Sequence, residues 1–228
     1  MTELWHGLLK AIELIITLDP EVMQIAGRSL SLAATSCAIG TLIFTPLGSI
    51  IYFNSFYGKR VLISIIQTLY SLPTVAVGLF VFVFISQAGP LGGFGLLFTP
   101  AAIVIGQVLL ISPIVMGLTI SALSGVDKAV SETAMSLGAN KLQIILLVIR
   151  EAKYAILTTV IMAFGRAVSE VGLSLMVGGN IRGYTRTLTT AISLETSKGD
   201  IELSLALGII LLFIALIINV VLNRFQQR

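Results

Sequence analysis

Residues 61–126 read VLISIIQTLYSLPTVAVGLFVFVFISQAGPLGGFGLLFTPAAIVIGQVLLISPIVMGLTISALSGV and contain no charged side chain. A helix needs about 20 apolar residues to cross a bilayer, so this stretch holds two spans and a short connection. Since the hydrocarbon core has no water to pair with backbone N–H and C=O groups, each span must pair these groups internally. The stretch therefore predicts two transmembrane helices, and with them an all-α membrane protein.

The composition of the whole chain agrees with this class. Hydrophobic residues make up 56% of the sequence and charged residues 11%, whereas soluble domains carry roughly 25% charged residues. We predict about five core spans, which cover residues 29–52, 61–86, 99–123, 154–177 and 203–223. Thr99-Pro100 is expected to begin the third span, because a hydroxyl cap and a proline suit the first turn. Pro46, Pro73 and Pro113 are predicted to lie inside the first three spans and to kink them.

The N-terminal segment differs from the spans. Its polar side chains recur every three or four residues, at Glu3, His6, Lys10, Glu13 and Thr17, which predicts an amphipathic helix. We predict that residues 4–18 lie at the outer membrane interface, and the alternative is a sixth, tilted span. Asp19-Pro20 is expected to cap the next helix. The chain therefore divides into an interfacial helix (1–19) and a transmembrane domain (20–228).

Basic residues predict the orientation, since loops rich in Lys and Arg stay on the cytoplasmic side. The connection after the first span holds Lys59 and Arg60, the loop 127–153 holds four basic residues, and the tail holds Arg224 and Arg228. We therefore predict a multi-pass protein of the cell (inner or plasma) membrane, with the N-terminus outside and the C-terminus in the cytoplasm. The net charge of +3 reflects this asymmetry and does not indicate a nucleic-acid partner.

The sequence offers few groups for catalysis or metal binding. Its one cysteine, Cys37, falls inside a span, and its one histidine, His6, has no second ligand nearby. The P-loop, His-Glu-x-x-His and Gly-x-Ser-x-Gly motifs are all absent from the sequence. We therefore expect no catalytic residue, no metal site and no cofactor in this chain, and we expect it not to be an enzyme by itself.

Arg166 and Glu170 are the ionisable side chains that the predicted spans contain. A spacing of four residues places them on one face of a helix, within reach of each other. Charged groups at membrane depth usually face the bundle interior or a water-filled cavity. One interpretation is an ion pair that holds the fourth span in place, and the other is that Arg166 also lines or gates an anion path.

The segment after the fourth span is rich in hydrogen-bond donors. It contains Asn180, Arg182, Thr185 and Arg186, followed by Thr187, Thr189 and Thr190. Guanidinium groups match pairs of carboxylate-like oxygens and hydroxyl groups fill the remaining lone pairs, so this set suits an oxyanion. The alternative is a solvated outer loop made of ordinary turn residues.

The stretch Glu132-Thr133-Ala134-Met135-Ser136-Leu137-Gly138 lies in the basic loop 127–153. Val126, Val130, Thr133, Ala134 and Leu137 fall on one stripe, which predicts a short amphipathic helix. Gly138 can end this helix with a positive φ, and Asn140 can cap a second helix that starts at Lys141. Such a helix could fit the groove of a partner protein or lie on the membrane surface.

Three motifs occur in a fixed order: the Glu132–Gly138 stretch, Gly165-Arg166-Ala167-x-x-Glu170-x-Gly172, and Gly179-Asn180-Ile181-x-Gly183-x-Thr185-Arg186-Thr187. Together they resemble the permeases of ABC importers for tetrahedral oxyanions, the molybdate, tungstate and sulfate group. Within this group the residues after the fourth span are most similar to those of tungstate permeases. The likeness covers roughly residues 20–223.

This resemblance implies the fold of a type I ABC-importer transmembrane domain. It also implies two separate ATPase subunits that carry ATP and Mg²⁺, an extracytoplasmic oxyanion-binding protein, and a second permease copy, most simply in a homodimer. Glu132, Thr133, Ala134 and Gly138 match the family's ATPase-docking motif. The sequence departs from the family pattern at Thr133, where a second alanine is usual, and at Arg150-Glu151, where Leu-Pro is common.

Several other functions remain open at this point. Molybdate or sulfate could replace tungstate as the transported anion. A secondary transporter or channel would work without ATP, but it is expected to need more intramembrane ionisable groups than Arg166 and Glu170. A membrane-embedded enzyme would need a nucleophile or metal ligands, which the sequence lacks.

Overall fold

The computed structural model describes residues 2–226. Arg228, which was counted among the basic residues of the tail, therefore lies outside the described residues, and so does the side chain of Glu3. The described part contains helices and no strand, which confirms the all-α prediction. The elements are α1 (Thr2–Ile16), α2 (Pro20–Phe53), α3 (Lys59–Thr68), η1 (Leu69–Ser71), α4 (Thr74–Ile85), η2 (Gly92–Phe94), α5 (Pro100–Ser124), α6 (Lys128–Ser136), α7 (Lys141–Glu151), α8 (Lys153–Val168), α9 (Gly172–Gly178), α10 (Leu188–Lys198) and α11 (Ile201–Gln226).

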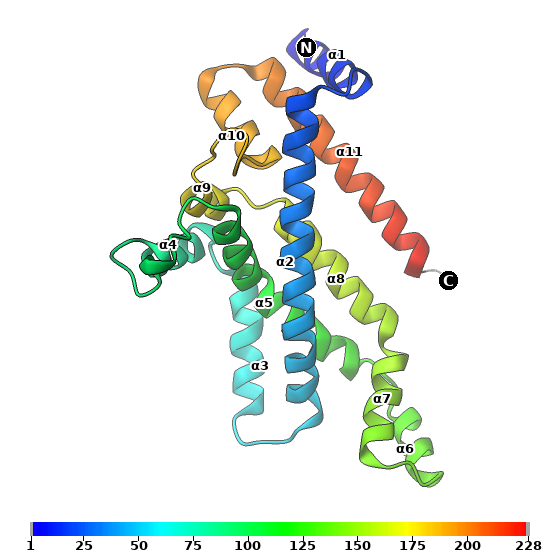
Figure 1. The fold of residues 1–228 in the computed structure, drawn as a ribbon. Coiled ribbons are helices and arrows are strands. Elements are labelled where there is room, and N and C mark those ends of the chain that lie inside the picture. The colour runs from blue at the N-terminus through cyan, green and yellow to red at the C-terminus, as the bar shows by residue number, and fades with distance from the viewer. Residues whose placement is uncertain (1, 227–228) are drawn as a thin grey trace.

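The molecule is elongated, with α1 and α10 at one end and the α6–α7 hairpin at the other (Figure 1). Among the described residues, α2, α5 and α11 are long and apolar enough to cross a membrane, and the number rises to five if the bent pairs α3–α4 and α8–α9 each count as one span. Ala33 and Cys37 of α2 pack with Ile111 of α5 and Ala163 of α8 in a shared core. These helices form the rigid centre of the fold.

The helix starts agree with their sequence signals. The Asp19 carboxylate accepts hydrogen bonds from the backbone N–H groups of Glu21 and Val22, and Pro20 opens α2. Thr99 accepts from the N–H of Ala102 at the start of α5. Each cap satisfies a backbone donor that the helix itself leaves unpaired. Both predicted starts are confirmed.

Two predicted spans are not continuous helices. The 61–86 stretch bends by 99° between α3–η1 and α4, and Pro73 lies at the break instead of inside a helix. Proline has no N–H and its ring clashes with the preceding turn, so the helix stops and restarts there. The 154–177 stretch bends by 60° between α8 and α9. The kink predicted at Pro73 is therefore a complete break, and the break between α8 and α9 was not predicted. Pro46 and Pro113 lie inside α2 and α5 as predicted.

The first break packs against a glycine of α5. A Cβ added to Gly117 would lie 1.7 Å from the hydroxyl oxygen of Tyr70 in η1. Real Cβ atoms do not approach other atoms so closely, so Tyr70 can keep this position only while residue 117 is glycine. The bend after α3 is thus supported by a tertiary contact as well as by Pro73.

Helix α1 packs across α11 and is not among the helices long enough to span a membrane. Ala11 and Leu14 are buried in the contact, and Gly7 allows Leu205 of α11 to approach closely. Trp5 and Ile16 are 61% and 75% exposed on the remaining surface. The amphipathic helix is confirmed, and its place at the membrane interface stays a prediction.

Helix α10 was not predicted from the sequence. Thr187 and Thr190 form a reciprocal capping box at its start, and Gly199 ends it at a φ of 83°. Leu188, Thr189 and Ala191 are buried. The threonines that suggested an exposed donor-rich loop therefore begin a buried helix.

Candidate functional site

The first site is the α6–α7 hairpin, which lies at one end of the molecule. At its corner Gly138 has a φ of 82°, the N–H of Ala139 donates to the carbonyl of Ala134, and the N–H of Gly138 donates to that of Met135. This pair of bonds is a Schellman motif, which needs a residue that tolerates positive φ. Asn140 then forms a capping box with Gln143 at the start of α7. The positive φ and the cap that the sequence predicted are both confirmed.

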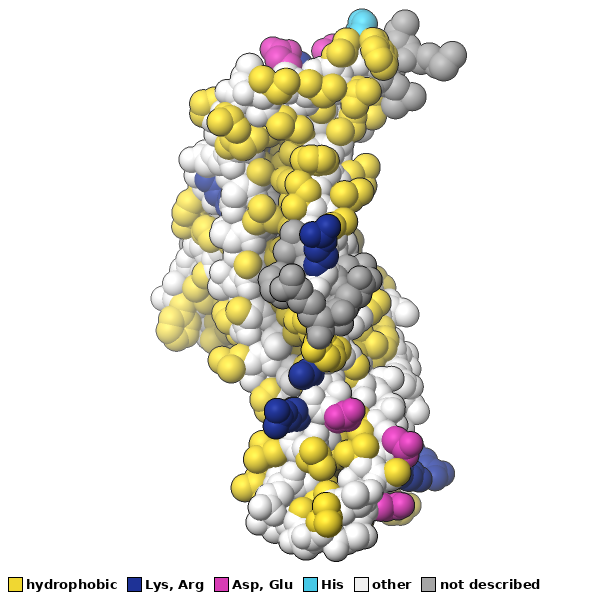
Figure 2. Space-filling view, turned by 90° about the vertical axis from the view of Figure 1, so that its right-hand side faces the viewer, with side chains coloured by type: hydrophobic (Ala, Val, Ile, Leu, Met, Phe, Trp, Pro, Cys, Tyr) yellow, Lys and Arg dark blue, Asp and Glu magenta, His cyan; other side chains and the backbone are white. Residues whose placement is uncertain are grey.

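The tip of the hairpin exposes large apolar side chains. Leu137 is 83% exposed, Leu142 65% and Met135 56%, whereas Ala134 is buried. Apolar and charged side chains alternate at this end in Figure 2. Large apolar side chains that are exposed side by side often mark a protein–protein contact. The hairpin thus has the composition of a docking surface, with Glu132 and Thr133 exposed on α6.

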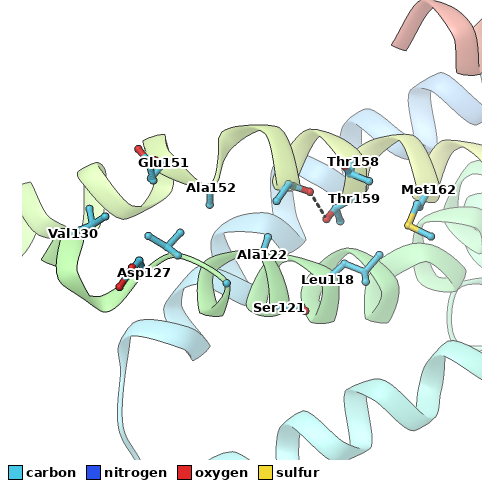
Figure 3. Close-up of a pocket in the computed structure, with 13 residues that line it drawn as sticks. Leu118, Ser121, Ala122, Asp127, Val130, Glu151, Ala152, Thr158, Thr159 and Met162 are labelled. Carbon is cyan, nitrogen blue, oxygen red and sulfur yellow. Dashed lines mark hydrogen bonds between the residues drawn. The ribbon is translucent and has the colours of Figure 1, made fainter. Parts of the chain in front are cut away.

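A pocket of 560 Å³ lies between the hairpin and the neighbouring parts of α5 and α8 (Figure 3). Its walls come from the ends of α5 and α8, with Leu118 and Met162, and from the hairpin, with Val130 and Glu151. Asp127 caps α6 at the pocket's edge by accepting from the N–H of Ala129. Next to this pocket, Val148 of α7 packs in one apolar cluster with Leu123 of α5 and Ile156 of α8, so the hairpin contacts both membrane helices through α7.

The second site is the break between α8 and α9. Nη1 of Arg166 lies 3.2 Å from Oε2 of Glu170, and the other carboxylate oxygen of Glu170 accepts from the N–H of Leu173 at 2.8 Å. The Glu170 side chain is 1% exposed and that of Arg166 is 30% exposed. The predicted pairing is confirmed. Glu170 also has a role that the sequence did not reveal, because it caps a backbone donor of α9.

Other polar side chains pair two more backbone groups near this break. Nε2 of Gln107 in α5 donates to the carbonyl of Ala167 at 3.0 Å, and its Oε1 accepts from Ser36 of α2 at 2.8 Å. The hydroxyl of Thr189 in α10 donates to the carbonyl of Glu170 at 2.8 Å. A break in a membrane helix is tolerated when neighbours satisfy the freed groups. Gln107, which sequence analysis did not single out, is 3% exposed and links three helices here.

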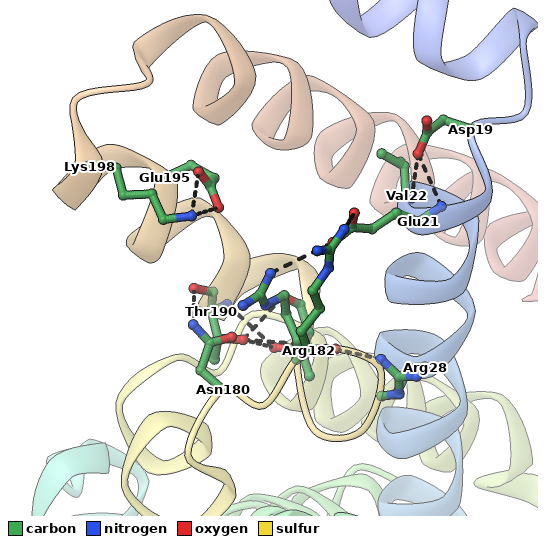
Figure 4. Close-up of polar contacts among 11 residues, drawn as sticks. Asp19, Glu21, Val22, Arg28, Asn180, Arg182, Thr190, Glu195 and Lys198 are labelled. Atoms are coloured by element: carbon green, nitrogen blue, oxygen red, sulfur yellow. Dashed lines mark hydrogen bonds and ion pairs between the residues drawn. The ribbon is translucent and has the colours of Figure 1, made fainter.

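The third site is the segment 179–187 between α9 and α10 (Figure 4). Nε of Arg182 donates to Oε1 of Glu21 at 2.8 Å, and its Nη2 contacts the second carboxylate oxygen. This hydrogen bond raises the pKa of Arg182. Nη1 of Arg186 lies 3.7 Å from Oε1 of Glu21. Arg28 of α2 donates to the carbonyls of Gly183 and Arg186, so the segment is held against the first part of α2.

Two residues that were predicted to line an anion path, Thr185 and Asn180, use their side chains to hold the backbone of this segment. The hydroxyl of Thr185 donates to the carbonyl of Gly178 and accepts from the N–H of Ile181, and the side chain is buried. Asn180 has a φ of 49° and donates to the carbonyl of Thr190. The structure thus brings Asn180, Thr185 and both arginines into one segment, apart from Arg166 and Glu170 at the break.

The chain matches known proteins along most of its length. The family model described as "Binding-protein-dependent transport system inner membrane component" matches residues 44–228. The tungstate uptake system permease protein TupB of Peptoclostridium acidaminophilum is 40% identical over 97% of both chains. A probable anion ABC transporter permease protein of Haloferax volcanii is 42% identical over 91% of both chains.

A solved structure has the same fold. The inward-facing MetNI methionine ABC transporter superposes with a TM-score of 0.73 at 16% identity, covering 92% of this chain and 97% of that chain. This likeness confirms the predicted type I importer fold of the membrane helices. The family match, the two relatives and the breaks and hairpin described above lead to one conclusion: this chain belongs to the family of binding-protein-dependent transport system inner membrane components.

Proposed function

We propose that this chain is the permease subunit of an ATP-driven importer that moves tungstate, a tetrahedral oxyanion, into the cytoplasm. The similarity to a tungstate uptake permease protein along almost the whole of both chains carries this proposal. The arginines at the break and in the segment 179–187 support an anionic substrate, because guanidinium groups bind oxyanions well. Molybdate and sulfate have the same shape and charge, so either is the second candidate.

The α6–α7 hairpin is the proposed docking site for an ATPase subunit. Two permease copies would therefore bind two ATPase subunits, one at each hairpin. Glu132, Thr133, Ala134 and Gly138 form its first helix and corner, and the exposed Leu137 supplies apolar contact area. ATP and Mg²⁺ would bind those partners, and this chain would bind no cofactor and catalyse no reaction. Packing behind the hairpin supports coupling, since Val148 of α7 lies in one cluster with Leu123 of α5 and Ile156 of α8.

The hairpin end is proposed to face the cytoplasm and the α1–α10 end the outside. Lys59, Arg60 and the basic loop 127–153 support this orientation. An extracytoplasmic oxyanion-binding protein would deliver its anion at the α1–α10 end, and a second copy of the chain would complete the path as a homodimer. The C-terminus then lies on the cytoplasmic side.

The anion path is proposed to use Arg182 and Arg186 at the outer end and Arg166 at depth, with Glu170 as the partner of Arg166. Asn180 and Thr185 hold the backbone that carries the outer arginines. In alternating access, closure of the ATPases would draw the hairpins together and open the path outward. The two broken spans supply bends at which the helices can reorient.

Transport by the reconstituted complex tests this function. Proteoliposomes that contain the permease, its ATPase and its binding protein are expected to accumulate tungstate with ATP, even with sulfate in excess. Molybdate should compete because it has nearly the same size. ATP-dependent uptake of sulfate alone would contradict the tungstate assignment, and uptake that continues without ATP would favour the secondary transporter. Leu137→Asp, which places a charge on the docking surface, should lose ATP-dependent uptake.

A further inference from the structure

A single carboxylate faces two guanidinium groups at the α1–α10 end. Glu21 of α2 pairs with Arg182 through both of its oxygens and approaches Arg186 at 3.7 Å. All three side chains line a pocket of 450 Å³. A water molecule takes up about 30 Å³, so this pocket has room for an oxyanion of four oxygens and several waters.

The Arg186 guanidinium has unused capacity for hydrogen bonds. Its side chain is 14% exposed, its Nε is buried without a hydrogen-bond partner among the described residues, and its 3.7 Å approach to Glu21 is too long for a hydrogen bond. Guanidinium has five N–H donors, and leaving buried ones unpaired is unfavourable. The exposed part of this guanidinium lines the pocket, so an anion with several oxygens there would give its donors more acceptors than the one carboxylate does.

The other charged groups in the pocket are already engaged. The Asp19 carboxylate caps α2, and both oxygens of Glu195 accept from Lys198 at 2.9 and 3.1 Å. Glu21 is therefore the acid that competes with an incoming anion for the arginines. Its pair with Arg182 is exposed, at 72% for Arg182 and 40% for Glu21, and exposed pairs are weak. A dianion carries twice the charge of a carboxylate and can displace it.

We propose that this pocket is an oxyanion-binding site in which Arg182 and Arg186 are the ligands and Glu21 is a counter-ion that the anion displaces. The inference rests on the proposed transport function. In the unliganded state Glu21 neutralises part of the arginine charge, which keeps the segment 179–187 in place and lowers affinity for weakly charged anions. Chloride cannot bridge two guanidinium groups as a tetrahedral dianion can.

Binding of tungstate to the purified permease–ATPase complex, without the binding protein, tests the site. Equilibrium dialysis with metal analysis measures the dissociation constant at fixed salt. Removing the competing charge in Glu21→Gln is expected to tighten binding by about threefold to fivefold, the range that a weak exposed pair can account for. Arg186→Gln is expected to weaken it by at least about tenfold, since charge-assisted bonds are lost.

Glu195→Gln is the matched control, because it removes an acid from the same pocket that pairs with Lys198 instead of an arginine. It should change the tungstate affinity by less than Glu21→Gln does. Unchanged or weaker binding in Glu21→Gln, together with unchanged binding in Arg186→Gln, would overturn the proposed site. If Glu21→Gln does not assemble, Glu21→Asp, whose shorter side chain loosens the contact with Arg182, replaces it with the same expected direction.

Transport by the wild type separates this inference from the proposed function. If the wild-type complex imports tungstate while neither variant changes tungstate binding, the function stands and the counter-ion site is wrong. If the wild type imports no oxyanion at all, the function itself is wrong.

Discussion

Arg166 in the last turn of α8 and Glu170 in the break that follows it are joined by a 3.2 Å contact between Nη1 and Oε2. Because the second carboxylate oxygen caps the N–H of Leu173, Glu170 connects α8 to α9 by two different interactions. One residue therefore sets both the charge balance and the backbone pairing of the break.

Removing one member of this pair should be worse than removing both. Arg166→Ala leaves a buried carboxylate without its partner, which costs about 3–5 kcal/mol of unfolding free energy. Arg166→Ala combined with Glu170→Gln should recover part of this loss, since the glutamine oxygen still accepts from Leu173 and carries no charge. The combination with Glu170→Ala should recover less. Thermal unfolding in detergent measures all three, and strictly additive losses would argue against the pair.

Gly138 should be required for coupling to the ATPase. Gly138→Val places a β-branched residue at a φ of 82°, which is strongly disfavoured, so the hairpin corner should open. Gly138→Asn is the control, because asparagine tolerates this conformation. Nothing lies within 4 Å of the added Cβ, so space is not the cause. ATPase binding and stimulated turnover should fall for valine and persist for asparagine, and wild-type behaviour of the valine variant would refute the docking assignment.

Gln107 of α5 should stabilise the break between α8 and α9, although it lies far from this break in the sequence. Gln107→Leu removes the donor to the carbonyl of Ala167 and the acceptor for Ser36, and each lost hydrogen bond contributes about 0.5–1.5 kcal/mol. The cost stays in this range because the Ser36 hydroxyl also donates to the carbonyl of Leu32 and the Ala167 carbonyl also accepts from the N–H of Glu170. Gln67→Leu, at an exposed position on α3, is the control and should change little. Equal unfolding temperatures for the two variants would show that the three-helix link contributes nothing.

A side chain at position 117 should displace Tyr70 and destabilise the fold. Gly117→Ala brings its Cβ to 1.7 Å from Tyr70, and overpacking of this kind costs about 1–3 kcal/mol. Gly208→Ala in α11 meets nothing within 4 Å and should be neutral or stabilising, since alanine favours helices. Adding Tyr70→Phe, which deletes the nearest atom, should relieve part of the strain. Unfolding temperatures should rise from Gly117→Ala to Gly117→Ala combined with Tyr70→Phe, and then to Gly208→Ala. An unchanged unfolding temperature for Gly117→Ala would contradict the packing at η1.

Trp5 can report where α1 lies. It is the one tryptophan of the chain and is 61% exposed on α1. For an interfacial helix, lipids brominated near the headgroup should quench its fluorescence more strongly than lipids brominated near the chain end. The reverse order would place Trp5 at depth and favour the sixth span. Trp5→Phe supplies the blank, because it removes the tryptophan signal.

The sequence alone determined the features that depend on neighbouring residues. The charge-free stretch 61–126 dictates membrane helices, because unpaired backbone groups are too costly in lipid. Asp19, Thr99 and Asn140 mark helix starts, since a cap bonds to an N–H two or three residues away. Gly138 marks the hairpin corner for the same local reason, and the spacing of Arg166 and Glu170 was enough to predict their contact.

The tertiary structure alone decided the features that join distant parts of the chain. Glu21 meets Arg182 and Gln107 meets Ala167 only because the helices pack side by side, and no local spacing encodes these contacts. The bends of the two broken spans also depend on packing, since Pro73 can either kink a helix or end it. Helix α10 was missed because it is short and polar, and burial against α2 and α11 stabilises it more than its own sequence does.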